Sequence, residues 1–265
     1  MAPRVLLAGY NLDRDLLREI RLLLEELAAT GGGPASPAFG ADPRLEELRA
    51  RVRLLLSRDN WTPETISAAY ARVSRDPRSV TELRALAREE VDRARRSNET
   101  IIFGLGHSSV AEHAVFNFDV LGLSRLAVET LERSRLASYT EKSQRYILLE
   151  EDWTLPEEIR GTAAEAHFRA TVAAQNRFYR EAYERLLPVV LARSPGEAAT
   201  PAQQRTLEGL AKEDARYALS LATTVQLGLT ANARTLESIL ARCRAHALQE
   251  VRELAEGLSA AVAGL

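Results

Sequence analysis

The chain has 265 residues, of which 46% are hydrophobic and 27% charged, as in folded globular proteins of one large domain or two small ones. Its formal net charge of −2 gives no overall field that would draw the chain onto nucleic acid or an anionic membrane, so we expect neither as a partner. Its apolar runs are all shorter than the roughly 20 residues that span a bilayer, and its first residues lack the pattern of a signal peptide. Cys243 is the only cysteine, which excludes an intrachain disulfide, and we expect a cytoplasmic protein.

The first sixty residues are predicted to form a strand, two helices and a connector. Residues 5–9 are a short apolar run typical of a strand, and leucines at helical spacing predict helices over 13–29 and 45–56. The Gly-rich stretch 31–37 lacks the Gly-Lys-Ser/Thr of a phosphate loop, so we interpret it as a connector. We therefore predict a first domain over 1–60 and a second over 61–265.

Helices dominate the rest of the chain. Thr62 before Pro63 predicts a capped helix start, and Ser79 with Glu82 forms a capping box for a helix that runs to about Arg96. The alternation over 115–120 predicts a strand, and a second short strand is expected over 146–149. Further helices are predicted over 124–136, 156–191, 202–227 and 236–260.

Polar residues concentrate first in the segment 106–113, which we expect to be a loop. Its two histidines and one glutamate lack the spacing of a helical zinc pair, so we predict no metal site. His107 either contacts a bound ligand or belongs to a surface loop, and the residues leave both interpretations open. His113 could likewise pack beneath the following strand.

Three further segments are rich in charge. Residues 132–146 hold three arginines and three serines at a helix–loop–strand junction, which suits a phosphate receptor but, taken alone, is more typical of a solvated turn. The charged turn 213–216 and the polar run 230–235 are each typical of solvent-facing surface. Arg242, His246 and Glu250 have the i, i+4, i+8 spacing of one helix face, which is usually a salt-bridged outer face.

Read together, these segments resemble the flavin-dependent thymidylate synthase family. That family carries the motif R-H-R-x-x-S-x-N-E-x-S-x-R-Y, and residues 133–146 read RSRLASYTEKSQRY. Its other segments match, in order, His107, Glu112-His113, Phe116-Asn117-Phe118, Ala215-Arg216, Asn232-Ala233-Arg234 and the stretch from Arg242 to Arg252. The resemblance covers about 97–258.

The resemblance implies an α/β fold with long helices around a small twisted, mainly antiparallel sheet. It implies methylation of dUMP to dTMP, with FAD as cofactor and NADPH and methylenetetrahydrofolate as co-substrates, in a homotetramer with shared active sites. The alternative is a diverged homologue that binds FAD and a uridylate but uses another substrate or has only a binding or regulatory role.

The resemblance also assigns roles to residues. The residues expected to act in catalysis are Glu141, Ser143 and Arg242. The residues expected to hold the uridylate are Glu141, Ser143, Arg145, Arg216 and Arg242. Arg145 and Arg216 are expected on its phosphate, and Arg242 against the uracil carbonyl. The residues expected to contact FAD are His113, Arg133, Ser134, Arg135, Asn232 and Arg234.

Several positions depart from the family pattern. Ser134 replaces the motif's histidine, Thr140 replaces its asparagine, and Thr130 stands where a glutamine is expected. The spacing in the last helix is one residue short, so Arg242 and Arg244 compete for one role. Because the histidine lies near the flavin in the family, the departures at Ser134 and Thr140 imply reduced synthase activity.

Overall fold

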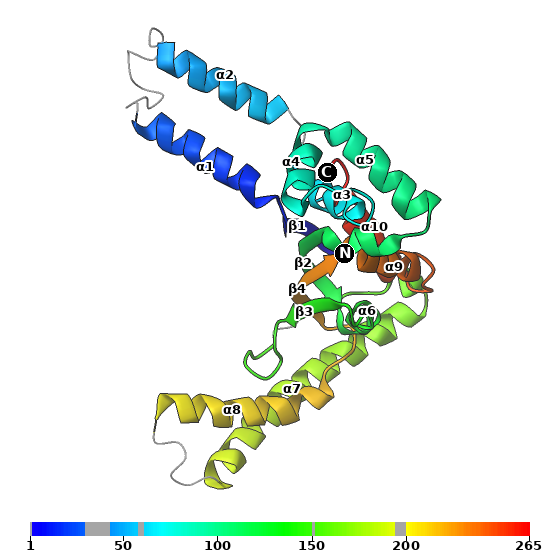
Figure 1. Ribbon diagram of the computed structural model, residues 1–265. Helices are drawn as coiled ribbons and strands as arrows, with labels where there is room; N and C mark the ends of the chain where they lie inside the picture. Colours follow the sequence, from blue (N-terminus) through cyan, green and yellow to red (C-terminus); the bar gives the residue numbers. More distant parts are fainter. Residues whose placement is uncertain (1, 30–42, 58–60, 150–151, 194–199) are drawn as a thin grey trace. The chain divides into compact units, whose positions relative to one another are not determined.

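The computed structural model describes residues 2–29, 43–57, 61–149, 152–193 and 200–265 (Figure 1). The predicted connector 31–37 and the predicted domain boundary at residue 60 lie outside these residues. The chain forms two compact units: one comprises 1–8, 117–230 and 237–263, and the other comprises 9–116, 231–236 and 264–265. Among the described helices, none is both long and apolar enough to cross a membrane.

Four strands form one antiparallel sheet in the order β1-β2-β4-β3, which confirms the predicted fold class. The strands are β1 (Arg4–Tyr10), β2 (Val115–Ser124), β3 (Ala137–Glu141) and β4 (Thr224–Asn232). The alternation predicted over 115–120 is confirmed, because Phe118 and Val120 are buried and Asn117 and Asp119 exposed. The strand predicted over 146–149 is wrong: residues 144–146 form a turn, and the strand of this region is β3, before it.

Five long helices belong wholly or mainly to the unit that contains residues 117–230. They are α6 (Arg125–Glu132), α7 (Ala164–Arg193), α8 (Pro201–Ala215), α9 (Ala233–Arg244) and α10 (Gln249–Ala261), with 3-10 turns η4 (Glu157–Ile159) and η5 (Arg216–Ala218). In this unit, α8 packs along α7 (Figure 1). Thr200 and Gln203 form a capping box at the start of α8.

Two long helices predicted in this region are each interrupted. The helix expected over 202–227 ends at Ala215, and the alternating residues from Thr224 onward form β4. The helix expected over 236–260 breaks between α9 and α10, where the Nδ1 of His246 accepts a hydrogen bond from the Leu248 amide (3.1 Å). Arg242, His246 and Glu250 therefore do not share one helix face.

A glycine sets the distance between β1 and α10. A Cβ atom at Gly257 would lie 2.9 Å from Cγ2 of Val5 and 3.2 Å from its Cβ, closer than packed carbon atoms approach. Because Gly257 has no side chain, the strand can lie directly on the helix. The same helix buries Val251, Leu254 and Leu258 in the core of this unit.

The other unit is helical. It contains α1 (Arg14–Ala29), α2 (Pro43–Ser57), α3 (Glu64–Arg72), α4 (Val80–Glu89), α5 (Val91–Glu99), the π-helix η2 (Thr100–Gly104) and the 3-10 helix η3 (Ser108–His113). Helices α1 and α2 lie side by side (Figure 1) through Leu16, Leu23, Leu48 and Leu55. A second cluster, built from Ala68, Ala69, Leu83, Ala87 and Ala94, joins α3, α4 and α5.

Local details of this unit confirm some predictions and correct others. The capping box of Ser79 and Glu82 is present, but the helix expected to run to Arg96 breaks at Glu90. The residues 108–113, expected in a loop, form η3. Thr62 makes no capping bond, because its Oγ1 is buried without a hydrogen-bond partner and the helix is preceded directly by Pro63.

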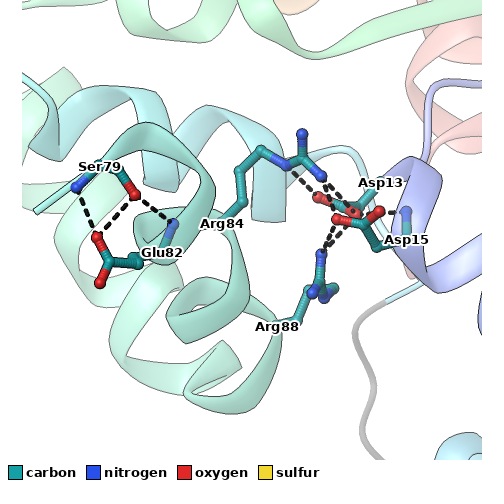
Figure 2. Close-up of polar contacts among 6 residues, drawn as sticks. All are labelled: Asp13, Asp15, Ser79, Glu82, Arg84 and Arg88. Carbon is teal, nitrogen blue, oxygen red and sulfur yellow. Dashed lines mark hydrogen bonds and ion pairs between the residues drawn. The ribbon is translucent and has the colours of Figure 1, made fainter.

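Figure 2 shows an ion-pair cluster that joins the start of α1 to α4. The carboxylate of Asp13 accepts hydrogen bonds from Nε of Arg84 (2.8 Å), from Arg88 (2.7 Å) and from the Asp15 amide (2.9 Å). Its side chain is 1% exposed. Burial alone would raise the pKa of Asp13, but these hydrogen bonds and the two guanidinium charges bring it below its usual range.

Candidate functional site

The motif segment 133–146 begins at the C-terminal end of α6, as predicted for Arg133. The start of α6 is fixed from α10: Oγ of Ser124 accepts from the Ala127 amide and donates to Glu250 (2.6 Å). The hydroxyl of Tyr139 lies 3.0 Å from the Leu131 carbonyl oxygen and 3.1 Å from that of Ser134. Tyr139, a residue of β3, thus holds the turn between α6 and β3.

Arg242 reaches this turn from α9. Its guanidinium donates a hydrogen bond to Oγ of Ser134 at 2.6 Å, although the two residues lie 108 positions apart in the chain. The Nε of Arg242 is buried and has no partner among the described residues. Arg244 instead pairs with Glu256 at 3.0 Å, and both side chains are exposed. Of the two arginines left open by the sequence, Arg242 is the one that lies beside the motif.

Arg242 also acts on the tyrosine beneath the turn. Burial raises the pKa of Tyr139, while its hydrogen bond to Ser134 and the charge of Arg242 act in the opposite direction. Tyr139 therefore stays a neutral donor that supports the turn.

Glu141 ends β3 and is paired with Arg125, the first residue of α6. Thr140 and Glu141 line a groove of about 460 Å3 together with Asp119, Lys142 and Gln226. Burial, followed by the negative charge of Glu141, raises the pKa of Glu132. Thr140, which replaces the family's asparagine, is exposed in this groove on the sheet.

Two predicted phosphate ligands meet at one carboxylate. Glu213, on α8, lies 2.9 Å from the guanidinium of Arg145 and 3.6 Å from that of Arg216. Oγ of Ser143 accepts a hydrogen bond from the Arg145 amide at 3.2 Å, and Lys212 donates to the Tyr146 carbonyl at 3.3 Å. These contacts fix the loop after β3 against α8 and bring Arg145 and Arg216 together.

Arg133 and Arg135 extend from either side of Ser134. Both side chains are exposed, and neither forms an ion pair within the described part of the chain. Arg133 and Arg135 therefore offer exposed guanidinium donors on the two sequence neighbours of Ser134, whose hydroxyl is bound by Arg242. Such a set fits a ligand rich in hydrogen-bond acceptors, such as the ring and pyrophosphate of a flavin dinucleotide.

The remaining predicted residues, His113, Asn232 and Arg234, belong to the other compact unit, where the structure brings them together. The Ala233 amide donates to the Ala114 carbonyl at 2.9 Å, and Arg234 pairs with Glu112. Oδ1 of Asn232 accepts from the Thr235 amide, so this side chain caps the start of α9. The ring of His113 packs edge-on against Tyr70, with 4.7 Å between centroids.

Glu213 and Arg125 take part in these contacts although no role was predicted for them. Glu213 stands three residues before Arg216, a spacing that could have paired them on a helix. Arg125 carries no such signal, because its partner Glu141 comes from the following strand. Within the described ranges, no cluster of three or more His, Cys, Asp or Glu residues could hold a metal ion.

Comparison with known proteins identifies related sequences. The family described as "Thymidylate synthase complementing protein" matches residues 55–264. A flavin-dependent thymidylate synthase of Clostridium tetani is 30% identical over 215 residues, which cover 80% of this chain and 82% of the relative. One from Pyrococcus furiosus is 33% identical over 160 residues, covering 58% of this chain and 57% of the relative. The match thus spans little more than half the length of the Pyrococcus protein.

Proposed function

The chain belongs to the flavin-dependent thymidylate synthase family, and on that premise we propose that it methylates dUMP to dTMP with FAD, NADPH and methylenetetrahydrofolate. One observation carries the proposal: the guanidinium of Arg242 lies on Ser134, inside the motif segment. Residues 108 positions apart that the resemblance assigns to one site are adjacent in the folded chain.

We assign the uridylate phosphate to Arg145 and Arg216. Glu213 occupies only part of their donor capacity, since each guanidinium has five N–H groups. The remaining donors can bind phosphate oxygens in pairs. Ser143 and Glu141 complete the pocket by position, and Glu141 is held in place by Arg125.

Arg242 is the residue we place against the pyrimidine. Ser134 accepts only one of the five N–H groups of this guanidinium, and a hydrogen bond from another to a uracil carbonyl oxygen would stabilise negative charge that develops on the ring. By their match to the family motifs, we assign FAD contacts to Arg133, Ser134 and Arg135, and also to His113, Asn232 and Arg234. Bound FAD supplies hydride transfer, which no side chain can perform.

Ser134, in place of the family's histidine, affects the turnover that we expect. Its hydroxyl accepts the hydrogen bond from Arg242, so in this chain the position orients the arginine. A serine is shorter than the family's histidine and carries no positive charge. We therefore propose weaker turnover than the family pattern implies, while the arginines retain FAD and uridylate binding.

We further propose a homotetramer in the cytoplasm. Large apolar side chains are exposed within the motif segment, at Leu136 (77%) and Tyr146 (78%), and after α8, at Tyr217 (82%) and Leu221 (59%). Association with other copies of the chain would cover such side chains. Cys243 is a buried free thiol, which suits a reducing compartment. Sedimentation of the purified protein that showed only a monomer would contradict the tetramer.

The experiment is a turnover assay of the full chain with dUMP, methylenetetrahydrofolate, NADPH and FAD, alongside dUMP titrations of Arg145→Ala. Loss of a charge-assisted hydrogen bond to phosphate should weaken dUMP binding by roughly 1.5–3 kcal/mol. Arg205→Ala, an exposed arginine on the same α8 that carries Glu213, is the matched control and should bind dUMP normally. Equal dUMP affinity in both variants would remove Arg145 from the site. FAD and dUMP binding without dTMP formation would favour the alternative of another substrate or a binding role.

A further inference from the structure

A second cluster of arginines lies in the helical unit, away from the motif segment. The C-terminal end of α3, α5 and η2 border an open pocket of about 480 Å3. Four arginines line it: Arg72, Arg75, Arg93 and Arg96. The only carboxylate among the described lining residues is that of Asp76. We name this group the α3–α5 arginine pocket.

The carboxylate of Asp76 is already committed to a neighbour. It accepts hydrogen bonds from Nε (2.9 Å), a terminal nitrogen (2.6 Å) and the backbone amide (3.0 Å) of Arg78. The hydrogen bonds from Arg78 lower the pKa of Asp76 to about 2. Asp76 is therefore ionised at neutral pH, but both of its oxygens face an arginine outside the pocket lining.

The other charges of the pocket are weakly compensated. Arg93 forms an exposed pair with Glu90 at 3.0 Å. Within the described residues, Arg72, Arg75 and Arg96 form no ion pair. Arg75 instead has a guanidinium nitrogen 3.5 Å from Nε2 of His107. His107, whose role the sequence left open, thus stands at the rim of this pocket.

We propose that the α3–α5 arginine pocket binds the phosphate groups of a small phosphorylated molecule. Like charges gathered in one cavity repel each other, and a bound anion relieves that repulsion. Guanidiniums offer paired donors that match phosphate oxygens, and Ser97 adds a hydroxyl to the lining. Ala71, Ile101 and Leu105 provide apolar wall beside the charged part. Nothing in this proposal depends on the proposed thymidylate synthesis.

The lining includes part of a π-helix. Thr100 and Ile101 belong to η2, and Thr100 donates its hydroxyl to the Arg96 carbonyl at 2.9 Å. Short π-helical segments occur frequently at functional sites. The widened turn places residues of α5 and η2 on the same cavity.

The test is calorimetric titration of the full chain with inorganic pyrophosphate at low salt. The background variant is Arg145→Ala with Arg216→Ala, which removes the proposed uridylate phosphate ligands, and it is titrated in saturating FAD so that the proposed flavin site is filled. We expect this background to retain a pyrophosphate site. Adding Arg72→Gln and Arg96→Gln should then weaken pyrophosphate binding about tenfold to a hundredfold for each charge-assisted hydrogen bond lost.

Arg21→Gln, an exposed arginine of the same unit, is the control and should leave pyrophosphate affinity unchanged. The proposal is overturned if the background variant binds no pyrophosphate, or if Arg72→Gln with Arg96→Gln binds it as well as the control. Much tighter binding of a short single-stranded DNA, lost in the same variant, would replace the small molecule with nucleic acid. The melting temperature of each variant shows whether it is folded.

Discussion

Two arginine groups of the helical unit differ in what faces them. Arg84 and Arg88 meet the buried carboxylate of Asp13 and the partly exposed one of Asp15. Arg72, Arg75 and Arg96 line a pocket where the carboxylate found among the described lining residues, that of Asp76, is bound by Arg78. The difference teaches that the carboxylates within reach, rather than the arginines themselves, decide whether such a group joins two helices or remains available to a ligand.

Removing the buried carboxylate should have the largest effect on stability. Asp13→Asn would leave Arg84 and Arg88 without their main acceptor, and breaking a charged, buried contact costs roughly 2–4 kcal/mol. We expect chemical denaturation to show a loss of that size in the free energy of unfolding. Asp15→Asn, at a carboxylate that is 42% exposed, is the matched control and should cost about 1 kcal/mol or less. Equal losses in the two variants would break the distinction.

Acid should remove the stability that the ionised carboxylate of Asp13 provides. The folded-state pKa of Asp13 lies below its usual range, so its stabilising effect is complete above the unfolded-state pKa of about 3.9 and is lost as pH falls through the folded value. The difference in unfolding free energy between the wild type and Asp13→Asn should therefore shrink below about pH 4. A difference that stays constant down to pH 2 would show that the carboxylate's charge is not what stabilises the cluster.

The capping box on the same α4 should have an intermediate effect. In Figure 2, Ser79 and Glu82 bond reciprocally at the exposed start of the helix. Ser79→Ala removes a cap worth about 1 kcal/mol, because the Glu82 amide then loses its side-chain acceptor. Ser79→Asn, which preserves a capping oxygen, should recover most of that loss in the same denaturation experiment.

The smallest effect is expected at the α3–α5 arginine pocket. Because Arg72 and Arg96 form no ion pair with any described residue, Arg72→Gln with Arg96→Gln should change the unfolding free energy by no more than about 0.5 kcal/mol. Removal of like charges could make that change slightly favourable, and the gain should fade as salt screens the repulsion. A loss above about 2 kcal/mol would mean that these arginines hold the unit together, as Arg84 and Arg88 do.

Much of the fold could be predicted where the pattern is local. The alternation of β2, the leucines of α1 and the box at Ser79 depend on residues within a few positions of each other. Strand β4 was missed because the apolar run before it continues a helical pattern, and only pairing in the sheet selects the strand. The break between α9 and α10 depends on Arg252 binding the carbonyl oxygens of residues 246 and 247.

In the candidate site, too, the contiguous pattern could be predicted from the sequence, whereas contacts between distant segments could not. Residues 133–146 could be recognised because the motif is contiguous, and the order of the other segments supported it. The contact of Arg242 with Ser134, and the shared carboxylate between Arg145 and Arg216, join distant segments and required the fold. The roles of these residues with FAD and dUMP, and the boundary near residue 60, stay predictions.

The close approach of β1 to α10 has a consequence for the descent of the protein. Because a Cβ at Gly257 would collide with Val5, the two positions cannot vary independently. A relative with alanine at 257 should carry a smaller residue at 5, so the pair should co-vary across the family. Replacement of Gly257 alone would destabilise the protein, while replacement at both positions 5 and 257 would be tolerated. This is expected when contacting residues contribute non-additively to stability.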